Sequence, residues 1–422
     1  MKRRLLFNRT AQVIHDRICE ERYRLRSVMR EADFTRLRKM GFTDYIYMTL
    51  QNTKTSLQAG LNAFLATHKK GKIEYSKQAY SKGRQRIKPE AFQELFYLVV
   101  ESFYENAELS TWNGYHLLGI DGTRLNLPCT DELAQLYGTQ ITGGVPQVQA
   151  LVSCVYDLLN GMIIDTRFAS CKSSERDAAL DLITSFWLRN IAKPVFVMDR
   201  GYPSAELIDA IDRAGHKFIM RCSTEFLRAM KLPQDDTILE HRFLKLKHSL
   251  KLRVLKIRLD GSNVEYLVTN IFDPSISAED FKWVYNKRWS IETKYNDVKN
   301  KLEIENFTGY SPIAILQDFY ATMFLADLAA VSEYDLRDEI EAAHAKPGNR
   351  YKYQMNIAMV ISELKQTVVE MVSTDSAIKR NHLFKKMTAR LSKAVVPVRP
   401  NRSSERQRMH KSMKFPVNSK RC

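Results

Sequence analysis

Residues 194–203 read PVFVMDRGYP, a short apolar run that ends at a carboxylate. A run of this length and composition, closed by turn residues, is typical of a strand buried on both faces. Asp199 would then stand at the end of that strand. The stretch predicts a buried β-strand with an acidic side chain where the strand leaves the core.

The segments around this strand predict the rest of a sheet. Three strand patterns precede it, the second and third joined by a tight turn at Asn160-Gly161, and a helix runs from Ser173 to about residue 190. A helix and another strand follow it. The strands are expected at 115–127, 148–159, 162–169, 194–198 and 217–221, and the second helix at 205–214. Three antiparallel strands, a helix, a strand, a helix and a strand predict an α/β fold: a mixed sheet flanked by helices.

Residues 223–273 interrupt this order with a β-rich insertion. Its alternation of apolar and basic residues changes phase at Val254/Leu255, which predicts a β-bulge and an outward face rich in Lys and Arg. After the insertion, apolar helices are expected at 313–331 and 355–372. The last part, 397–422, holds eight basic residues and one acid, and is expected to be disordered until it meets phosphate.

Composition points to a polyanionic partner. The 422 residues carry a formal net charge of +17, which favours nucleic acid, although charge alone does not separate DNA from an anionic membrane surface. No apolar run approaches a membrane span and no signal-peptide core follows the basic start, so we expect a cytoplasmic protein without membrane contact. Six scattered cysteines without C-x-x-C pairs argue against a disulfide framework and a structural zinc site.

The N-terminal 110 residues have helical spacing and a basic segment, SKQAYSKGRQRIKP, at 76–89. Short helices joined by a basic segment suit DNA docking, with Arg84 and Arg86 as expected contacts. A basic surface helix without any partner is the alternative.

Residues 284–303 read VYNKRWSIETKYNDVKNKLE, which predicts one helix of about five turns. Tyr285, Arg288, Glu292 and Lys299 fall within a narrow arc of that helix, beside a stripe with core spacing. Taken alone, this pattern is more typical of a solvated face with ion pairs between neighbouring turns. A functional role for these four residues therefore requires partner side chains from other parts of the chain.

Two aspartates supply such partners. Asp121 lies in the first predicted strand and Asp199 ends the fourth, and a carboxylate at the end of a buried strand is costly unless it is paired or ligated. If these strands are neighbours and the 284–303 helix crosses their edge, Glu292 completes three hard oxygen donors. Such a set suits Mg²⁺ or Mn²⁺, and two ions there could activate a water or a 3′-hydroxyl. For Asp121-Gly122, a plain turn is the alternative.

The spacing Tyr285-x2-Arg288-x3-Glu292-x6-Lys299 resembles the Y-R-E-K signature of the insertion-sequence-four group of bacterial DDE transposases. IDGT around Asp121, MDRGY around Asp199 and the β-rich insertion resemble that group too, over roughly residues 76–330. The resemblance implies a ribonuclease-H-like catalytic core and metal-dependent DNA transposition, with Asp121, Asp199 and Glu292 as catalytic metal ligands.

The same resemblance implies double-stranded DNA partners, namely terminal inverted repeats and target DNA, and two protomers in the synaptic complex of a nucleoid-associated bacterial protein. It implies phosphate contacts by Tyr285, Arg288 and Lys299; Arg200 and Trp289 are further expected DNA contacts, and Trp289 could instead simply pack. The expected domains are a helical DNA-binding region at 1–110, the catalytic domain at 111–330, C-terminal helices at 331–396 and the basic tail at 397–422.

One feature departs from the group. Some members form a hairpin intermediate with the help of a tryptophan in the insertion, and none of the four tryptophans here lies in 223–273. Phe243, Tyr266 or Phe272 could stack on a base instead, or belong to the core, so the hairpin stays open. Two other functions also stay open: a transposase-derived DNA-binding protein without catalysis, and a nuclease that does not join strands.

Overall fold

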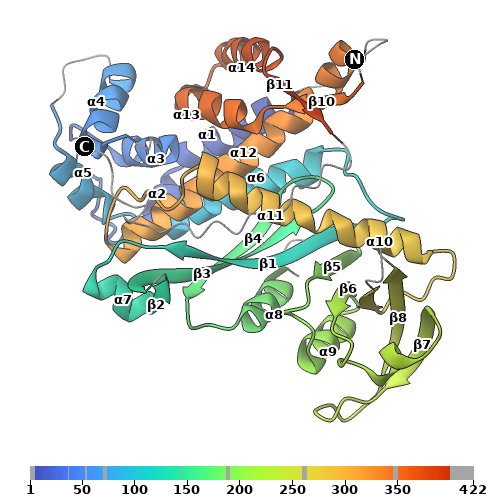
Figure 1. The fold of residues 1–422 in the computed structure, drawn as a ribbon. Coiled ribbons are helices and arrows are strands. Elements are labelled where there is room, and N and C mark those ends of the chain that lie inside the picture. Colours follow the sequence, from blue (N-terminus) through green and yellow to red (C-terminus); the bar gives the residue numbers. More distant parts are fainter. Residues whose placement is uncertain are drawn as a thin grey trace. The chain divides into compact units, whose positions relative to one another are not determined.

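The computed structural model describes residues 5–36, 38–52, 55–69, 74–142, 144–186, 191–258, 264–345 and 350–399. The chain divides into two compact units, which are described separately (Figure 1). Unit 1 comprises Met1–Ala107, Asn126–Gln149 and Asn296–Cys422, and unit 2 comprises Glu108–Leu125 and Ala150–Tyr295. These two compact units differ from the four domains expected from the sequence, and the expected domain boundaries stay a prediction.

Unit 2 is built on a mixed sheet. Its core strands lie in the order β4–β3–β1–β5–β6, with β4 antiparallel to β3, and with β5 parallel to both β1 and β6. This is the strand order of a ribonuclease-H-like core, so the predicted fold class is confirmed. The strands are β1 (His116–Asn126), β3 (Val145–Asp157), β4 (Ile163–Ser170), β5 (Pro194–Met198) and β6 (Lys217–Cys222).

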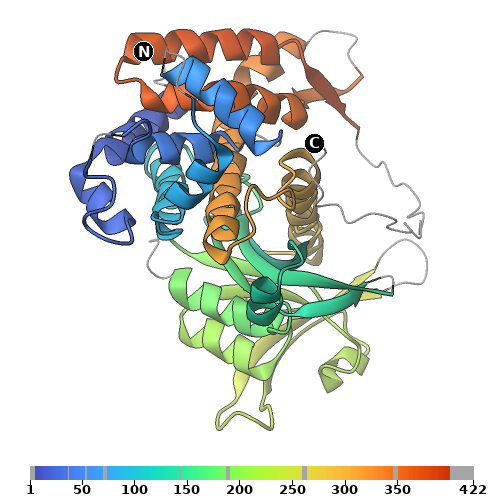
Figure 2. The same cartoon turned by 90° about the vertical axis from the view of Figure 1, so that its left-hand side faces the viewer.

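Helices cover both faces of this sheet, as Figures 1 and 2 show. On one face lie α8 (Glu175–Phe186) and α9 (Ala205–Arg213); on the other lie α10 (Ala278–Lys287) and α11 (Trp289–Asn296). All five residues of β5 are buried as a result. This confirms that the apolar run 194–198 is a strand buried on both faces.

The insertion extends the same sheet as β9–β8–β7 beyond β6. Its elements are the short 3-10 helix η2 (Arg228–Lys231) and the strands β7 (Asp236–His241), β8 (Leu250–Arg258) and β9 (Val264–Thr269). The predicted bulge at Val254/Leu255 is wrong, because β8 pairs with both neighbours without a register shift. The apolar alternation changes at this point because Leu252, Val254 and Leu255 are all buried, which means that both faces of β8 are buried in the middle of the strand.

Arg253 is a second exception in the insertion, since it was expected on a solvated face. It is only 4% exposed. Its guanidinium donates to Asp236 (2.6 Å) and to the carbonyl oxygens of Asp273 and Ile276, and lies 5.2 Å from the ring of Phe281. The side chain therefore ties β8 to the segment that leads into α10.

Unit 1 is mainly helical. Figure 1 shows α1, α3, α6 and α13 gathered around α12, with which they make contact. The elements are α1 (Leu6–Cys19), α2 (Glu21–Ser27), α3 (Phe42–Gln51), α4 (Leu57–His68), α5 (Lys77–Arg84), α6 (Glu90–Asn106), α7 (Asp131–Tyr137), β2 (Thr139–Thr142), the π-helical segment η3 (Asp297–Lys301), α12 (Pro312–His344), β10 (Lys352–Met355), α13 (Ile357–Ser373), α14 (Ala377–Leu391) and β11 (Val395–Val398).

The central helix α12 is longer than expected. It begins after the N-cap Ser311, with Pro312 in its first turn, and runs through the expected boundary at residue 330. By length and composition α12 could cross a membrane, which corrects the statement that no apolar run reaches that length. However, 89% of its most apolar window is buried inside the protein, as in the core helix of a globular unit.

The start of the basic tail is also ordered. Val395–Val398 forms β11, which pairs with β10 in an antiparallel two-stranded sheet, with Pro397 opposite Tyr353. Disorder was expected from residue 397 onward, and that expectation is wrong for Pro397 and Val398. Residues 400–422 lie outside the described residues.

Arg84 belongs to the core of unit 1. It is 2% exposed and donates to Asp318 (2.8 Å) and Gln317 (2.7 Å) of α12, and to the hydroxyl of Thr308. The DNA contact expected of Arg84 is therefore wrong, because every direction of its guanidinium is used inside the protein. Arg86, whose side chain is 48% exposed and 3.8 Å from Asp33, remains an expected DNA contact.

Arg84→Met should destabilise unit 1, because it leaves the buried carboxylate of Asp318 without its cation. We expect the free energy of unfolding to fall by about 3–5 kcal/mol, measured by chemical denaturation. Arg86→Met is the control, and its half-exposed ion pair should change stability by less than about 1 kcal/mol. Equal losses in the two variants would contradict the structural role of Arg84.

Candidate active site

Two aspartates meet where β1 and β5 run side by side. The strands pair in parallel from His116↔Pro194 to Gly119↔Val197. The same offset continued by two residues places Asp121 opposite Asp199, which directly follows β5. The prediction that the first and fourth strands are neighbours is confirmed.

Asp121 sits in an environment that resists ionisation. Its side chain is 18% exposed, and burial raises the pKa of its carboxyl to about 6. The backbone N–H of Gly122, which donates to Asp121 Oδ1 (2.9 Å), and the cation of Arg288 pull this pKa down, while the charges of Asp199 and Glu292 push it up. Burial, more than the neighbouring charges, therefore disfavours the ionised form of Asp121.

Glu292 comes from the helical segment over this region. A capping box begins this segment: the Ser277 hydroxyl accepts from the Asp280 N–H, and the Asp280 carboxylate accepts from the Ser277 N–H. The single helix expected at 284–303 is wrong in two places. The α-helical pattern is interrupted at Arg288, whose N–H donates to the Tyr285 carbonyl, and it becomes π-helical from Asp297.

Arg288 joins the helix to the strand end. It is 4% exposed; one guanidinium nitrogen donates to Glu292 Oε1 (3.0 Å) and the other lies 4.0 Å from Asp121 Oδ2. The guanidinium also lies over the rings of Tyr285 (5.6 Å) and Trp289 (5.0 Å). In this structure the cation expected to hold a phosphate neutralises two of the three predicted metal ligands.

The other expected DNA contacts differ in exposure. Tyr285 is 3% exposed, and its hydroxyl has no hydrogen-bond partner of normal geometry among the described residues. Trp289 is 49% exposed, and Arg200 is exposed in the turn after Asp199. Trp289 and Arg200 therefore lie where a DNA strand could reach them.

Lys299 is described with unit 1, where it lies in η3. Burial lowers the pKa of its ammonium, which the nearby carboxylate of Glu305 partly offsets. Glu305 in turn accepts from the backbone N–H of Asn126 (3.0 Å). The helical arc that predicted a role for Lys299 assumed α-helical spacing, which does not apply within η3.

Sequence reasoning missed three side chains around Asp121. Tyr295 donates its hydroxyl to the Asp121 carbonyl oxygen (2.6 Å). Tyr202 is 1% exposed, its hydroxyl has no hydrogen-bond partner among the described residues, and burial, together with the carboxylates of Asp121, Glu175 and Asp199, raises its pKa well above the usual range. Tyr202 was visible in the motif around Asp199 as a candidate for contact with the site.

Glu175 is the third missed side chain. It follows Ser174 at the start of α8, and its carboxylate packs against Gly122. A Cβ atom at position 122 would lie 3.1 Å from the Glu175 side chain, so any other residue there would require that side chain to shift by a few tenths of an ångström. The only sequence signal for Glu175 was its position in the first turn of a helix, where an acidic residue usually indicates no more than the start of the helix.

The donor chemistry fits a hard divalent cation. Asp121, Asp199 and Glu292 offer carboxylate oxygens, the ligands that Mg²⁺ and Mn²⁺ prefer. A bound cation would favour the ionised form of Asp121, which burial disfavours. Within the described part of the chain, no three His, Cys, Asp or Glu side chains stand ready to hold an ion. Arg288, between Asp121 and Glu292, occupies part of the position where a cation would be needed.

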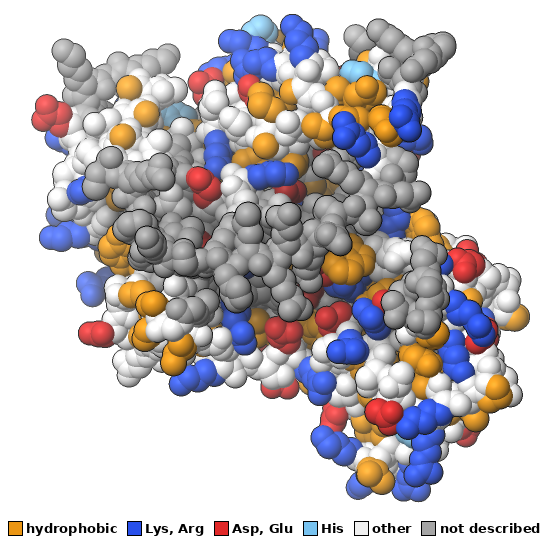
Figure 3. Space-filling view, viewed as in Figure 1, with side chains coloured by type: hydrophobic (Ala, Val, Ile, Leu, Met, Phe, Trp, Pro, Cys, Tyr) orange, Lys and Arg blue, Asp and Glu red, His pale blue; other side chains and the backbone are white. Residues whose placement is uncertain are grey.

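The insertion presents a basic surface in the same unit. Figure 3 shows Lys and Arg side chains spread over its end of the molecule. Lys231, Lys245 and Arg258 pair with acidic side chains. The other exposed cations there, for which no acidic partner is found among the described residues, are Arg228, Arg242, Lys247 and Lys251.

The aromatic side chains of the insertion have protein neighbours. The ring of Phe243 lies 4.5 Å from that of His241 and 5.8 Å from that of Phe226. The ammonium of Lys251 lies 4.8 Å from the ring of Phe272. Phe243 and Phe272 are thus held within the insertion, which leaves the hairpin question as the sequence left it.

Residues 114–328, slightly more than half of the chain, match the family described as transposase DDE domain. The chain belongs to the transposase DDE domain family. The matched region begins before β1 and ends within α12, so it includes Asp121, Asp199 and Glu292. Family membership does not by itself assign the insertion-sequence-four group.

Among solved structures, this DDE-domain chain is similar to a piggyBac transposase synaptic complex with hairpin DNA, determined by cryo-EM. The identity is 9%, the TM-score is 0.48, and the match covers 96% of this chain and 88% of that chain. No curated protein matches the chain.

The raised pKa of Asp121 gives a stability test without metal. An acid whose pKa is higher in the folded than in the unfolded protein destabilises the fold once ionised. This loss of stability is absent below about pH 4, the pKa of the carboxyl in the unfolded protein. It grows as the pH rises and is complete above about pH 6, the pKa in the folded protein. Asp121→Asn should therefore raise the free energy of unfolding at pH 7.5, by at most about 3 kcal/mol.

Denaturant unfolding of the metal-free protein at pH 7.5 and pH 4 measures this effect. The gain should disappear at pH 4, and Glu31→Gln, which removes an exposed carboxylate of unit 1, should show neither the gain nor its pH dependence. A destabilised Asp121→Asn variant at pH 7.5 would contradict the environment described for Asp121.

Arg288→Met should improve metal binding, because it removes the cation that competes for Asp121 and Glu292. We expect the half-saturating Mg²⁺ concentration in thermal-shift titrations to fall about tenfold, equivalent to about 1.4 kcal/mol of repulsion. Arg253→Met is the matched control: a buried arginine of the same unit, paired with Asp236. It should lower Tm without changing the Mg²⁺ response. An unchanged or weaker Mg²⁺ response in Arg288→Met would exclude the competition.

Proposed function

We propose that this chain is the DNA transposase of an insertion sequence of the insertion-sequence-four group. It binds terminal inverted repeats, cleaves the element's ends and joins their 3′-hydroxyls to target DNA in the bacterial cytoplasm, at the nucleoid. The observation that carries the proposal is the β1–β5 register, which sets Asp121 beside Asp199 in a chain of the transposase DDE domain family.

In this proposal Asp121, Asp199 and Glu292 hold two Mg²⁺ or Mn²⁺ ions. Bound there, the ions supply activation of a water or 3′-hydroxyl and neutralise charge on the departing oxygen. Arg288 balances the carboxylates of Asp121 and Glu292 in the metal-free protein and contacts a DNA phosphate in the complex. Two protomers are expected, because two ends must be cut and joined together.

Further side chains are proposed to hold the DNA. Lys299 and Tyr285 contact phosphates of the transposon end, Arg200 and Arg86 contact the backbone, and the half-exposed ring of Trp289 packs on a sugar or base. Arginine suits the phosphate contacts because its planar fork can donate two hydrogen bonds to one phosphate.

Glu292→Gln tests the proposal on DNA that flanks the gene. The variant should bind terminal-repeat DNA like the wild type, while Mg²⁺-dependent release of 3′-hydroxyl ends falls about a thousandfold or more, since several kcal/mol of charge stabilisation are lost. Glu279→Gln removes an 80% exposed carboxylate from α10 and should retain full cleavage.

Three other outcomes would contradict the proposal. Cleavage by Glu292→Gln at the wild-type rate would remove Glu292 from the site. Repeat binding by the wild type without any cleavage in Mg²⁺ or Mn²⁺ would indicate a DNA-binding protein that has lost catalysis. Cleavage without joining to a target plasmid would indicate a nuclease.

A further inference from the structure

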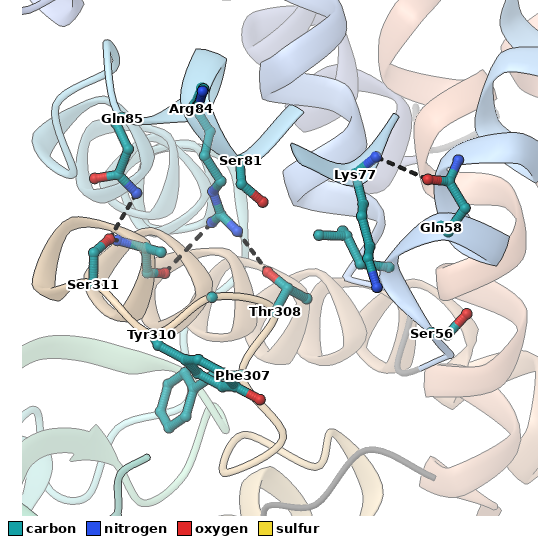
Figure 4. A pocket seen from close by; sticks show the side chains of 14 residues that line it. Ser56, Gln58, Lys77, Ser81, Arg84, Gln85, Phe307, Thr308, Tyr310 and Ser311 are labelled. Atoms are coloured by element: carbon teal, nitrogen blue, oxygen red, sulfur yellow. Dashed lines mark hydrogen bonds between the residues drawn. The ribbon is translucent and has the colours of Figure 1, made fainter. Parts of the chain in front are cut away.

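Unit 1 contains a cavity of about 760 Å³, and none of the three candidate metal ligands is among its lining residues. It lies between the start of α4, one face of α5 and the loop that leads into α12 (Figure 4). Its volume is in the range of sites that hold small organic groups. The lining residues that matter for its chemistry are Lys77, Lys82, Arg84, Gln85, Gly309 and Tyr310.

Several polar groups of the wall are fixed by internal hydrogen bonds. Figure 4 shows Arg84 and Gln85 reaching the loop, where Arg84 donates to Thr308 and Gln85 donates to the Ser311 hydroxyl (2.6 Å). On the opposite side, Gln58 accepts from the backbone N–H of Lys77 (2.8 Å). These bonds hold the shape of the cavity before any ligand arrives.

Three groups of the lining are left over. The ammonium groups of Lys77 and Lys82 and the hydroxyl of Tyr310 have no partner among the described residues, and all three side chains are exposed, Tyr310 by 62%. The charge of Arg84 is balanced by Asp318, which does not line the cavity. No Asp or Glu is among the lining residues, so the cavity presents two uncompensated positive charges beside an exposed aromatic ring.

Gly309 shapes the wall that carries Tyr310. A Cβ atom at position 309 would lie 2.6 Å from the Cβ of Ala314, so only glycine lets the loop approach the first turn of α12 this closely. The loop is thus held against α12, while the Tyr310 ring stays exposed.

We propose that this cavity binds one unpaired nucleotide of a DNA strand, with its phosphate at Lys77 and Lys82 and its base against Tyr310. Cationic side chains beside an exposed aromatic ring are the features with which proteins bind single strands, because every base has a face that can stack. A base inside a duplex cannot stack on a side chain unless it leaves the helix. The inference extends the proposed function, on which it rests for its DNA partner.

Fluorescence anisotropy in EDTA tests the site with Glu292→Gln as the parent protein, so that cleavage plays no part. The probes are a blunt duplex from the gene's flank and the same duplex with four unpaired nucleotides at one end. The parent should bind the frayed probe more tightly. Tyr310→Leu should weaken binding of the frayed probe about 5- to 150-fold, the range of base stacking on an aromatic ring, and Tyr310→Phe should retain it.

The lysines are tested through salt dependence, which a merely structural residue would not change. Lys77→Gln with Lys82→Gln should reduce the slope of log affinity against log salt by about 0.7 for the frayed probe, because the site holds one phosphate of a single strand. Lys385→Gln with Lys386→Gln removes two exposed cations from α14 of the same unit and should leave the slope unchanged.

Four results would overturn the site. The parent could bind both probes with equal affinity, or Tyr310→Leu could lose the same affinity for both. The parent could also bind an RNA version of the frayed probe more tightly than the DNA. Finally, a free deoxynucleotide could displace the frayed probe at the same concentration as frayed DNA. These binding measurements do not depend on cleavage. If the protein proved not to be a transposase but still bound the frayed probe as described, the proposed nucleotide site would still hold.

Discussion

The parallel pairing of β1 with β5 is the constraint on which the candidate active site depends. A parallel pair brings the same ends of two strands to one edge, and here the register leaves no offset between the two aspartates. A shift by one residue would send one carboxylate to the opposite face, because side chains alternate along a strand. The pairing from His116↔Pro194 to Gly119↔Val197 keeps one register throughout.

The site combines like charges at partly buried positions, which is unfavourable until a cation arrives. In the metal-free protein Arg288 partly compensates for this, as its two terminal nitrogens face Glu292 and Asp121. The hydroxyls of Tyr202 and Tyr285, for which no hydrogen-bond partner of normal geometry is found among the described residues, belong to the same surroundings. Buried polar groups without partners cost free energy, so their presence here fits a region that is completed by a ligand and not by the fold alone.

The sequence predicted the parts of this arrangement that depend on local pattern. PVFVM identified a strand covered on both faces and Asp199 marked its end, because burial and strand ends each have a local signature. Glu175 could not be found in this way, since its contact with Gly122 is made between a strand and a helix that are far apart in sequence. The π-helical turns at η3 likewise have no signature in a charge pattern that assumes 3.6 residues per turn.

The largest errors concerned cations, and they share a cause. Arg84 and Arg253 each lie in a basic stretch whose cations were expected at the surface, yet each is at most 4% exposed and bound to a carboxylate. A net charge of +17 therefore says that phosphate is attracted, but not which cations meet it. The discriminating property is the absence of an internal acidic partner, which sequence spacing does not show because Asp318 is 234 residues from Arg84. Lys77 and Lys82, on the same helix as Arg84, meet that condition among the described residues, so one helix supplies both a cation for the core and cations for a ligand.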